Sequence, residues 1–108
     1  MVYGKIQRVF QNFYKIYFKM KIKIELFGVS REFSKNNLIE FEVNNNSTIK
    51  DVRVKMINYL DQNFNGNENF KKIVNSSAFC SENNNIVSDN YKITKNEKIA
   101  IIPPIGGG

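Results

Sequence analysis

The stretch that decides the fold is Lys98-Ile99-Ala100-Ile101-Ile102-Pro103-Pro104-Ile105-Gly106-Gly107-Gly108. Its first five residues are a nearly continuous apolar run, which predicts a central β-strand buried on both faces. Pro103 and Pro104 fix φ and favour an extended polyproline conformation, so the chain should leave the domain in a fixed direction. The glycines that follow have no Cβ and can pass close to another protein's backbone. We expect a flexible tail over 103–108 that spans about 20 Å at ~3.3–3.6 Å per residue.

The carboxylate of Gly108 is the candidate reactive group of this tail. A terminal carboxylate has a reference pKa near ~3.5 and is therefore ionised and a poor electrophile. Adenylation would convert it into an acyl-phosphate anhydride, and sulfur displacing AMP would leave a thiocarboxylate. A glycine leaves room for both steps. The alternative, a frayed end or a cloning remnant, fits a triglycine that follows a buried strand and two prolines less well.

The amino-acid composition limits the reactions that the chain can catalyse by itself. The 108 residues suit one domain, and they include no His, no Trp and one Cys. A Cys/His metal cluster, a Ser-His or Cys-His pair and an internal disulfide are therefore excluded, which leaves no catalytic residues for turnover by this chain alone. A single thiol without a partner is typical of a reducing compartment, so we expect a cytoplasmic protein.

The net charge of +6 is concentrated in the first twenty residues. That segment has four basic residues and no acid, whereas the remainder carries 12 basic and 10 acidic residues. The domain is therefore nearly neutral, and we expect it to bind no nucleic acid. The four basic residues are Lys5, Arg8, Lys15 and Lys19.

Residues 1–19 form a basic, amphipathic N-terminal extension, with apolar residues at three- and four-residue steps opposite the basic ones. The segment is too short and too polar for a membrane span. Three interpretations stay open: a dispensable extension before a start at Met20, a targeting or membrane-surface helix, and a helix that packs on the domain or on a partner. A protein whose activity lies at a membrane surface would have to place that activity here.

The domain is expected over 20–102, and its first half has a clear strand-strand-helix pattern. Residues 21–27 and 38–43 alternate polar and apolar, which predicts two half-buried strands in an antiparallel hairpin with its turn at 34–37. Thr48 is a suitable N-cap for a helix, and Asp51 three residues later can complete a capping box. The apolar stripe of that helix consists of Ile49, Val52, Met56, Tyr59 and Leu60.

The second half predicts shorter elements. Residues 70–74 are ambiguous and consistent with a short helical turn, while 78–80 and 86–87 predict short strands around a polar loop at 82–85. A turn at 94–97 would place Asn96 in a left-handed conformation. The order strand-strand-helix-strands, with the last strand central, predicts an α+β fold of the β-grasp (ubiquitin-like) type, a mixed sheet packed on one main helix.

Three segments carry a resemblance to the molybdopterin synthase small subunit, a family of ubiquitin-like sulfur carriers. Phe27-Gly28-Val29-Ser30-Arg31-Glu32 follows the first strand, Thr48-Ile49-Lys50-Asp51-Val52 begins the helix, and the Pro-Pro and glycine ending closes the chain. The ending is the most specific of the three, because thiamine sulfur carriers and the ubiquitin-related modifier typically lack the Pro-Pro. The family's Gly-Asp-Glu turn is replaced by Asn96-Glu97.

The resemblance implies a function for the tail and a set of partners. A ubiquitin-activating-like adenylyltransferase would use ATP to adenylate Gly108, which would then be thiocarboxylated; no cofactor is bound permanently. The large catalytic subunit of molybdopterin synthase would form a hetero-oligomer with the chain. It would receive the tail residues Pro103, Pro104, Ile105, Gly106 and Gly107, and use the sulfur to convert cyclic pyranopterin monophosphate to molybdopterin. A sulfur carrier for thiamine or tRNA thiolation, or a ubiquitin-like protein modifier, is the alternative.

The resemblance also implies that Phe27 and Ile102 contact the large subunit, although both also fit as core residues. Arg31 is a second candidate contact, and a solvated ion pair with Glu32 is its alternative. Cys80 has no His to activate it and follows an apolar residue in a predicted strand, so we expect a packed core thiol.

Overall fold

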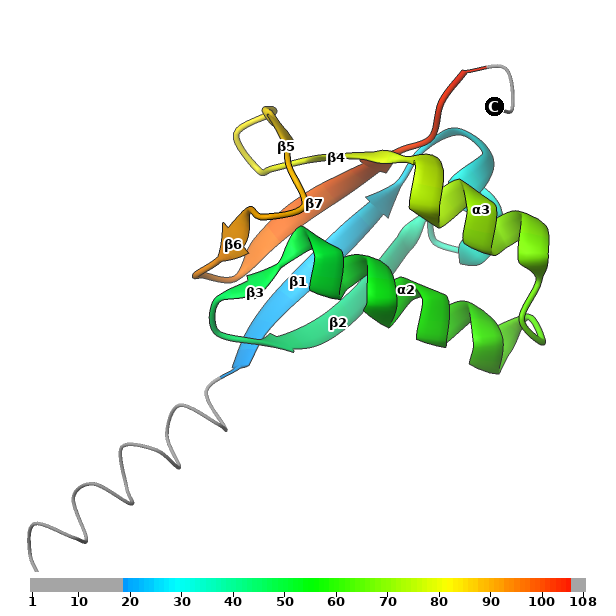
Figure 1. Ribbon diagram of the computed structural model, residues 1–108, viewed down its shortest axis with the longest axis horizontal. Helices are drawn as coiled ribbons and strands as arrows, with labels where there is room; N and C mark the ends of the chain where they lie inside the picture. Colours follow the sequence, from blue (N-terminus) through cyan, green and yellow to red (C-terminus); the bar gives the residue numbers. More distant parts are fainter. Residues whose placement is uncertain (1–18, 106–108) are drawn as a thin grey trace, which may run out of the picture.

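The computed structural model describes residues 19–105, which form one mixed sheet with two helices on one of its faces (Figure 1). The sheet has five strands in the order β2-β1-β7-β4-β5. They are β1 (Lys19–Leu26), β2 (Leu38–Asn44), β4 (Ala78–Cys80), β5 (Ile86–Val87) and β7 (Glu97–Ile102). A two-stranded sheet pairs β3 (Ser47–Thr48) with β6 (Lys92–Ile93), and the helices are η1 (Gly28–Phe33), α2 (Ile49–Asn63) and α3 (Glu68–Ser76).

The strand pairing confirms the predicted β-grasp fold. β1 pairs antiparallel with β2 and parallel with β7, while β7 also pairs antiparallel with β4. The last strand is therefore the central one, and α2 is the main helix on the sheet. The register joins Ile24 to Ile39 on one side and to Ile99 on the other, so that apolar side chains of neighbouring strands share a face.

The core lies between that face and the helices. Every second residue of β1 and β7 points inward, and α2 presents the apolar stripe predicted for it. Tyr59 belongs to the stripe but is only half-buried, because its hydroxyl donates a hydrogen bond of 2.6 Å to the carbonyl of Phe33. The fully buried large side chains include Phe33, Phe79, Ile22, Ile24, Ile49, Met56, Leu60, Ile93, Ile99 and Ile101.

The predicted burial of the last strand on both faces is wrong. β7 alternates between buried and more exposed residues, and Lys98 and Ile102 face away from the helices. The reason is that both helices cover the same face of the sheet, and no helix or strand formed by residues 19–105 covers the other (Figure 1). The apolar run at 99–102 therefore contributes to two surfaces, a core and an open face.

The connection between β1 and β2 contains more structure than the turn predicted for it. The 3₁₀ helix η1 occupies most of it, and the turn that follows contains Asn37 at φ 55°. The hairpin itself is confirmed, although β1 begins at Lys19, two residues earlier than predicted. Residues 1–18 lie outside the described residues, and so do the interpretations of the N-terminal extension.

The start of α2 has the capping box that the sequence predicted. The Thr48 hydroxyl accepts a hydrogen bond from the Asp51 backbone N–H at 3.4 Å, and the Asp51 carboxylate accepts one from the Thr48 N–H at 2.9 Å. Two N–H groups that a helix start leaves without partners are satisfied in this way, which fixes where α2 begins.

Residues 68–76 form a nine-residue helix, α3, longer than the single turn considered for this stretch. The Asn67 side chain caps it by accepting a hydrogen bond from the Phe70 N–H at 3.1 Å. The Phe70 ring lies 5.1 Å from the Phe33 ring and 5.1 Å from the Phe64 ring, centroid to centroid. This aromatic cluster joins α3 to η1 and to the end of α2, which the short sequence pattern could not show.

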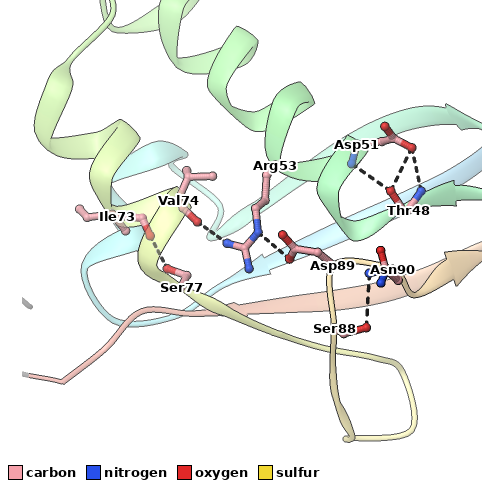
Figure 2. A network of polar contacts seen from close by, with 9 residues as sticks. All are labelled: Thr48, Asp51, Arg53, Ile73, Val74, Ser77, Ser88, Asp89 and Asn90. Carbon is pink, nitrogen blue, oxygen red and sulfur yellow. Dashed lines mark hydrogen bonds and ion pairs between the residues drawn. The ribbon is translucent and has the colours of Figure 1, made fainter.

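Arg53 of α2 joins three segments that are distant in the sequence, and Figure 2 shows its contacts with two of them, at Val74 and Asp89. Its guanidinium donates to the carbonyl of Val74 in α3 at 2.6 Å and to the carboxylate of Asp89 at 3.0 Å. It also lies 4.7 Å from the centre of the Phe79 ring in β4. Because these partners come from α3, β4 and the loop before β6, Arg53 fixes the position of α3 on the domain.

Asparagine has a structural role at several turns of the domain. Four asparagines in 19–105 have positive φ, a conformation that Asn tolerates better than most residues. They are Asn37, Asn46, Asn65 and Asn84. Asn96 is not among them, so the predicted left-handed turn there is wrong; its side chain instead accepts a hydrogen bond from the Lys21 N–H at 2.8 Å, which joins the turn to β1.

Candidate functional site

The site begins where β7 leaves the sheet. Ile102 ends the strand, the Pro103 side chain is buried, and Pro104 is exposed. Ile105 is fully exposed, with 103% of its reference area accessible, which is unusual for a large apolar side chain. Gly106, Gly107 and Gly108 lie outside the described residues. A strand of the sheet is thus followed by a buried proline and then by exposed residues, as expected for the start of the predicted tail.

Pro103 is anchored against the start of η1. A Cβ placed on Gly28 would lie 3.8 Å from Pro103 Cδ, an ordinary van der Waals distance, so the Pro103 ring lies near Gly28 with room for a methyl group between them. Gly28 has φ +56°, in the left-handed region where L side chains are strained. The glycine thus provides the turn out of β1, and this turn lies near the tail root, residues 102–105.

Phe27 directly follows β1, and Ile102 is the last residue of the neighbouring strand β7. Both side chains face the open side of the sheet. Leu26 is paired with Ile101, and each of the two candidate residues follows directly after one member of that pair. Their exposed fractions are 40% for Phe27 and 41% for Ile102, so neither is a core residue. Together with Ala78, which is paired with Ile102, and Ala100, they form what we call the outer patch.

Charged side chains flank the outer patch. Arg31 is exposed and lines a groove together with Phe27 and Lys98. Lys98 is 3.8 Å from the Glu25 carboxylate, whereas Arg31 has no carboxylate within 4.0 Å among residues 19–105. The alternative in which Arg31 pairs with Glu32 is therefore absent from this structure. Arg31 is placed where it can contact a partner on the open face.

Cys80 is not a core thiol. It is the last residue of β4, lies opposite Ala100 and is half-buried, because the inward position of this short strand is taken by Phe79. The thiol therefore belongs to the open face. Residues 19–105 bring no group of three His, Cys, Asp or Glu side chains together as a metal site would require.

Two side chains in residues 19–105, Tyr91 and Lys71, have raised pKa values. Burial, together with the negative charge of Glu97 and its hydrogen bond, raises the pKa of Tyr91; the hydroxyl lies 3.2 Å from both Glu97 carboxylate oxygens. The hydrogen bond to Asp61, at 2.7 Å, raises the pKa of Lys71. Glu97 is at the opposite end of β7 from the tail, so Tyr91 is not placed to act on a terminal carboxylate.

A second apolar surface at the tail root was missed by sequence reasoning. A hollow of about 190 Å³ opens between η1, α3 and the two prolines. Val29, which is 46% exposed, and Ile73 supply its apolar wall. The only signal in the sequence was the ambiguous stretch 70–74, consistent with a short helical turn, which is too short to place a helix beside the tail.

The fold and the tail root define the class of protein: a ubiquitin-like β-grasp domain whose central strand leads directly into an exposed tail. The model of the ThiS family matches residues 24–108, so the chain belongs to the ThiS family of ubiquitin-like sulfur carriers. The resemblance seen in the sequence is thereby confirmed at the level of the carrier family. None of the curated proteins matches the chain.

Solved structures show the same fold at low sequence identity. A Pyrococcus furiosus protein given as molybdopterin converting factor, subunit 1, has 11% identity and a TM-score of 0.60, covering 80% of this chain and 99% of that one. Haloferax volcanii small archaeal modifier protein 1 has 12% identity, a TM-score of 0.59 and coverage of 80% and 99%. Caldiarchaeum subterraneum ubiquitin has 22% identity, a TM-score of 0.52 and coverage of 83% and 99%.

No helix within residues 19–105 is long and apolar enough to cross a membrane.

Proposed function

We propose that this protein is the sulfur carrier subunit of molybdopterin synthase and that Gly108 is its working residue. The observation that carries the proposal is the tail root: the central strand β7 passes into a buried Pro103 and then into exposed Pro104 and Ile105. An anchored exit aims the following residues away from the domain. Membership of the ThiS family, whose model extends over residue 108, supports the assignment of sulfur chemistry to that end.

The chemistry takes place in other proteins' active sites. A carboxylate oxygen of Gly108 attacks the α-phosphorus of ATP in an adenylyltransferase, and pyrophosphate leaves. A sulfur nucleophile then attacks the glycyl carbonyl, and AMP leaves, which gives a thiocarboxylate. The carrier contributes a carbonyl without a side chain beside it, and an extended tail that reaches about 20 Å from the strand end at ~3.3–3.6 Å per residue.

The acceptor is proposed to be the large subunit of molybdopterin synthase, which would convert cyclic pyranopterin monophosphate to molybdopterin. Pro103-Pro104 before the glycines favours this acceptor over thiamine or tRNA thiolation. The outer patch, with Phe27 and Ile102 near 40% exposure and Arg31 beside them, would contact the large subunit. In this assignment the protein acts in the cytoplasm.

The test is a reconstitution with purified components. The carrier is incubated with ATP, a ubiquitin-activating-like adenylyltransferase and a sulfur source, and intact mass spectrometry follows one oxygen-to-sulfur exchange. Peptide mapping should place the sulfur at Gly108. Deletion of Gly108 should abolish the exchange without changing the circular dichroism spectrum, and Cys80→Ser should leave it intact. Sulfur found on Cys80 would overturn the site assignment.

A second step separates the pathways. The thiocarboxylated carrier is mixed with the large subunit and cyclic pyranopterin monophosphate, and molybdopterin is measured after oxidation to a fluorescent derivative. Product formation supports the proposal. Sulfur transfer only to a thiamine precursor or to tRNA, or an isopeptide bond to target lysines, would assign the chain to one of the alternative functions.

A further inference from the structure

Two surfaces flank the tail root, and only one of them is used by the function proposed above. The outer patch lies on the open face of the sheet. The hollow between η1 and α3, which we call the α3 hollow, shares Pro103 and Pro104 with the tail itself. Its remaining lining residues are Val29, Asn69, Lys72, Ile73 and Ser76.

Because the tail is short, any enzyme that binds its end must lie close to the tail root. Beyond Pro104 the four residues 105–108 span at most about 14 Å, at ~3.3–3.6 Å each. A carboxylate held in an active site therefore lies within about that distance of Pro104. Because an active site is enclosed by protein, the receiving enzyme's surface must approach the residues around Pro104 closely.

Selection among receiving enzymes requires side chains, and three of those four residues are glycines. The enzyme can therefore recognise the extended shape of the tail, but it finds few side chains to contact there. Discrimination between one adenylyltransferase or acceptor and another must come from residues beside the root, which lie either in the outer patch or in the α3 hollow. The α3 hollow is closer to the tail than any other concave surface described here, since both prolines line it.

The hollow combines an apolar wall with one unpaired cation. Val29 exposes 46% of its area, and Ile73 is half-buried beside it. Lys72 is exposed on the rim and has no carboxylate within 4.0 Å among residues 19–105, unlike its neighbour Lys71, which is paired with Asp61. The chemistry that fits is an apolar side chain with a carboxylate next to it.

The wall of the hollow is held rigidly. The Arg53 guanidinium donates to the carbonyl of Val74 in α3, and the Ser77 hydroxyl donates to the carbonyl of Ile73 at 2.5 Å (Figure 2). At the other end of α3, Phe70 packs against Phe33. A surface fixed before binding loses little conformational entropy when a partner docks.

We propose that the α3 hollow is a second docking surface, distinct from the outer patch, for the adenylyltransferase that receives the tail. An apolar side chain of that enzyme would pack on Val29 and Ile73, and a carboxylate of the enzyme would pair with Lys72. The proposal rests on the proposed function, because it requires that an enzyme takes the tail. It adds the residues that select this enzyme.

The experiment measures ATP–pyrophosphate exchange by the adenylyltransferase as a function of carrier concentration. The full-length chain carries Val29→Asp or Lys72→Glu, two substitutions at exposed positions that should not disturb folding. We expect the KM for the carrier to rise about tenfold or more with kcat nearly unchanged, because a docking contact is lost while the tail is intact. Circular dichroism checks that each variant is folded.

Val54→Asp is the matched control. Val54 is exposed to a similar extent, 54%, on α2, and it lines neither the hollow nor the outer patch. We expect its KM to equal that of the wild type. If Val29→Asp and Lys72→Glu both behave like Val54→Asp while deletion of Gly108 abolishes exchange, the docking proposal is overturned and the carrier function stands. If the wild-type chain supports no exchange, both fail.

Discussion

Replacing Arg53 with methionine should lower the stability of the domain more than any other single surface-charge change. Methionine keeps most of the apolar stem of the side chain and removes the guanidinium. The Arg53 side chain is only 18% exposed, and it bridges Val74, Phe79 and Asp89. Its removal therefore affects α2, α3, β4 and the loop before β6 together.

The magnitude follows from the three contacts. A hydrogen bond from a charged donor to a buried carbonyl contributes about 1.5–3 kcal/mol, and that to Val74 is short at 2.6 Å. The cation–π contact with Phe79 adds about 0.5–1 kcal/mol. Since Asp89 is 51% exposed, its ion pair adds only about 0.2–1 kcal/mol. We expect Arg53→Met to lower the free energy of unfolding by about 2–5 kcal/mol.

The assay is urea denaturation followed by far-ultraviolet circular dichroism, since the chain has no Trp to report by fluorescence. Asp89→Ala is the matched variant and should cost less than about 1 kcal/mol, because it removes only the exposed contact. A loss under about 0.5 kcal/mol for Arg53→Met, or an equal loss for Asp89→Ala, would show that the contacts of Arg53 with Val74 and Phe79 do not stabilise the domain.

Three further predictions concern local features. Thr48→Ala should cost about 0.5–2 kcal/mol in the same urea titration and Thr48→Ser much less, because serine keeps the cap of α2; equal losses would contradict the capping box. The pKa of Tyr91 is raised above 10.0 in the folded state, so its contribution is complete below that pH and is lost as the pH rises through the folded pKa. The stability of the wild type relative to Tyr91→Phe should therefore fall above pH 10, and a constant difference would speak against the burial of this hydroxyl. Gly28→Ala should cost about 1–2 kcal/mol because φ is +56°, with Gly28→Asn cheaper; no difference between the two would mean that strain at this turn is not the cause.

The architecture could be predicted because its signals are local and periodic. The alternation in 21–27 and 38–43 predicted the hairpin, and Thr48 with Asp51 predicted the helix start. The burial of β7 could not be read from its composition, because an apolar run looks the same whether one or both faces are covered. Only the placement of the two helices on one side decides this.

The part of the candidate site that is contiguous in the sequence could be predicted, but the contacts between distant segments could not. The tail follows from the sequence, because it comes directly after the last strand. For Phe27 and Ile102 it is the resemblance to the carrier family that indicates a partner contact, and the structure shows only that both are about 40% exposed. The α3 hollow depends on contacts between distant segments: Val29 and Ile73 are brought together by the packing of α3 against η1. Similarly, the spacing of Arg53 and Asp89 in the sequence does not predict their ion pair.

Sulfur loading at the chain end can be tested with a variant that carries one additional alanine after Gly108. Thiocarboxylate formation by this variant and by the wild type is followed by intact mass spectrometry. We expect the wild type to gain one sulfur and the extended variant to gain none, because an active site fitted to a terminal glycine cannot accept the added residue. If the extended variant is loaded with sulfur and donates it at the wild-type rate, Gly108 is not the sulfur-carrying residue.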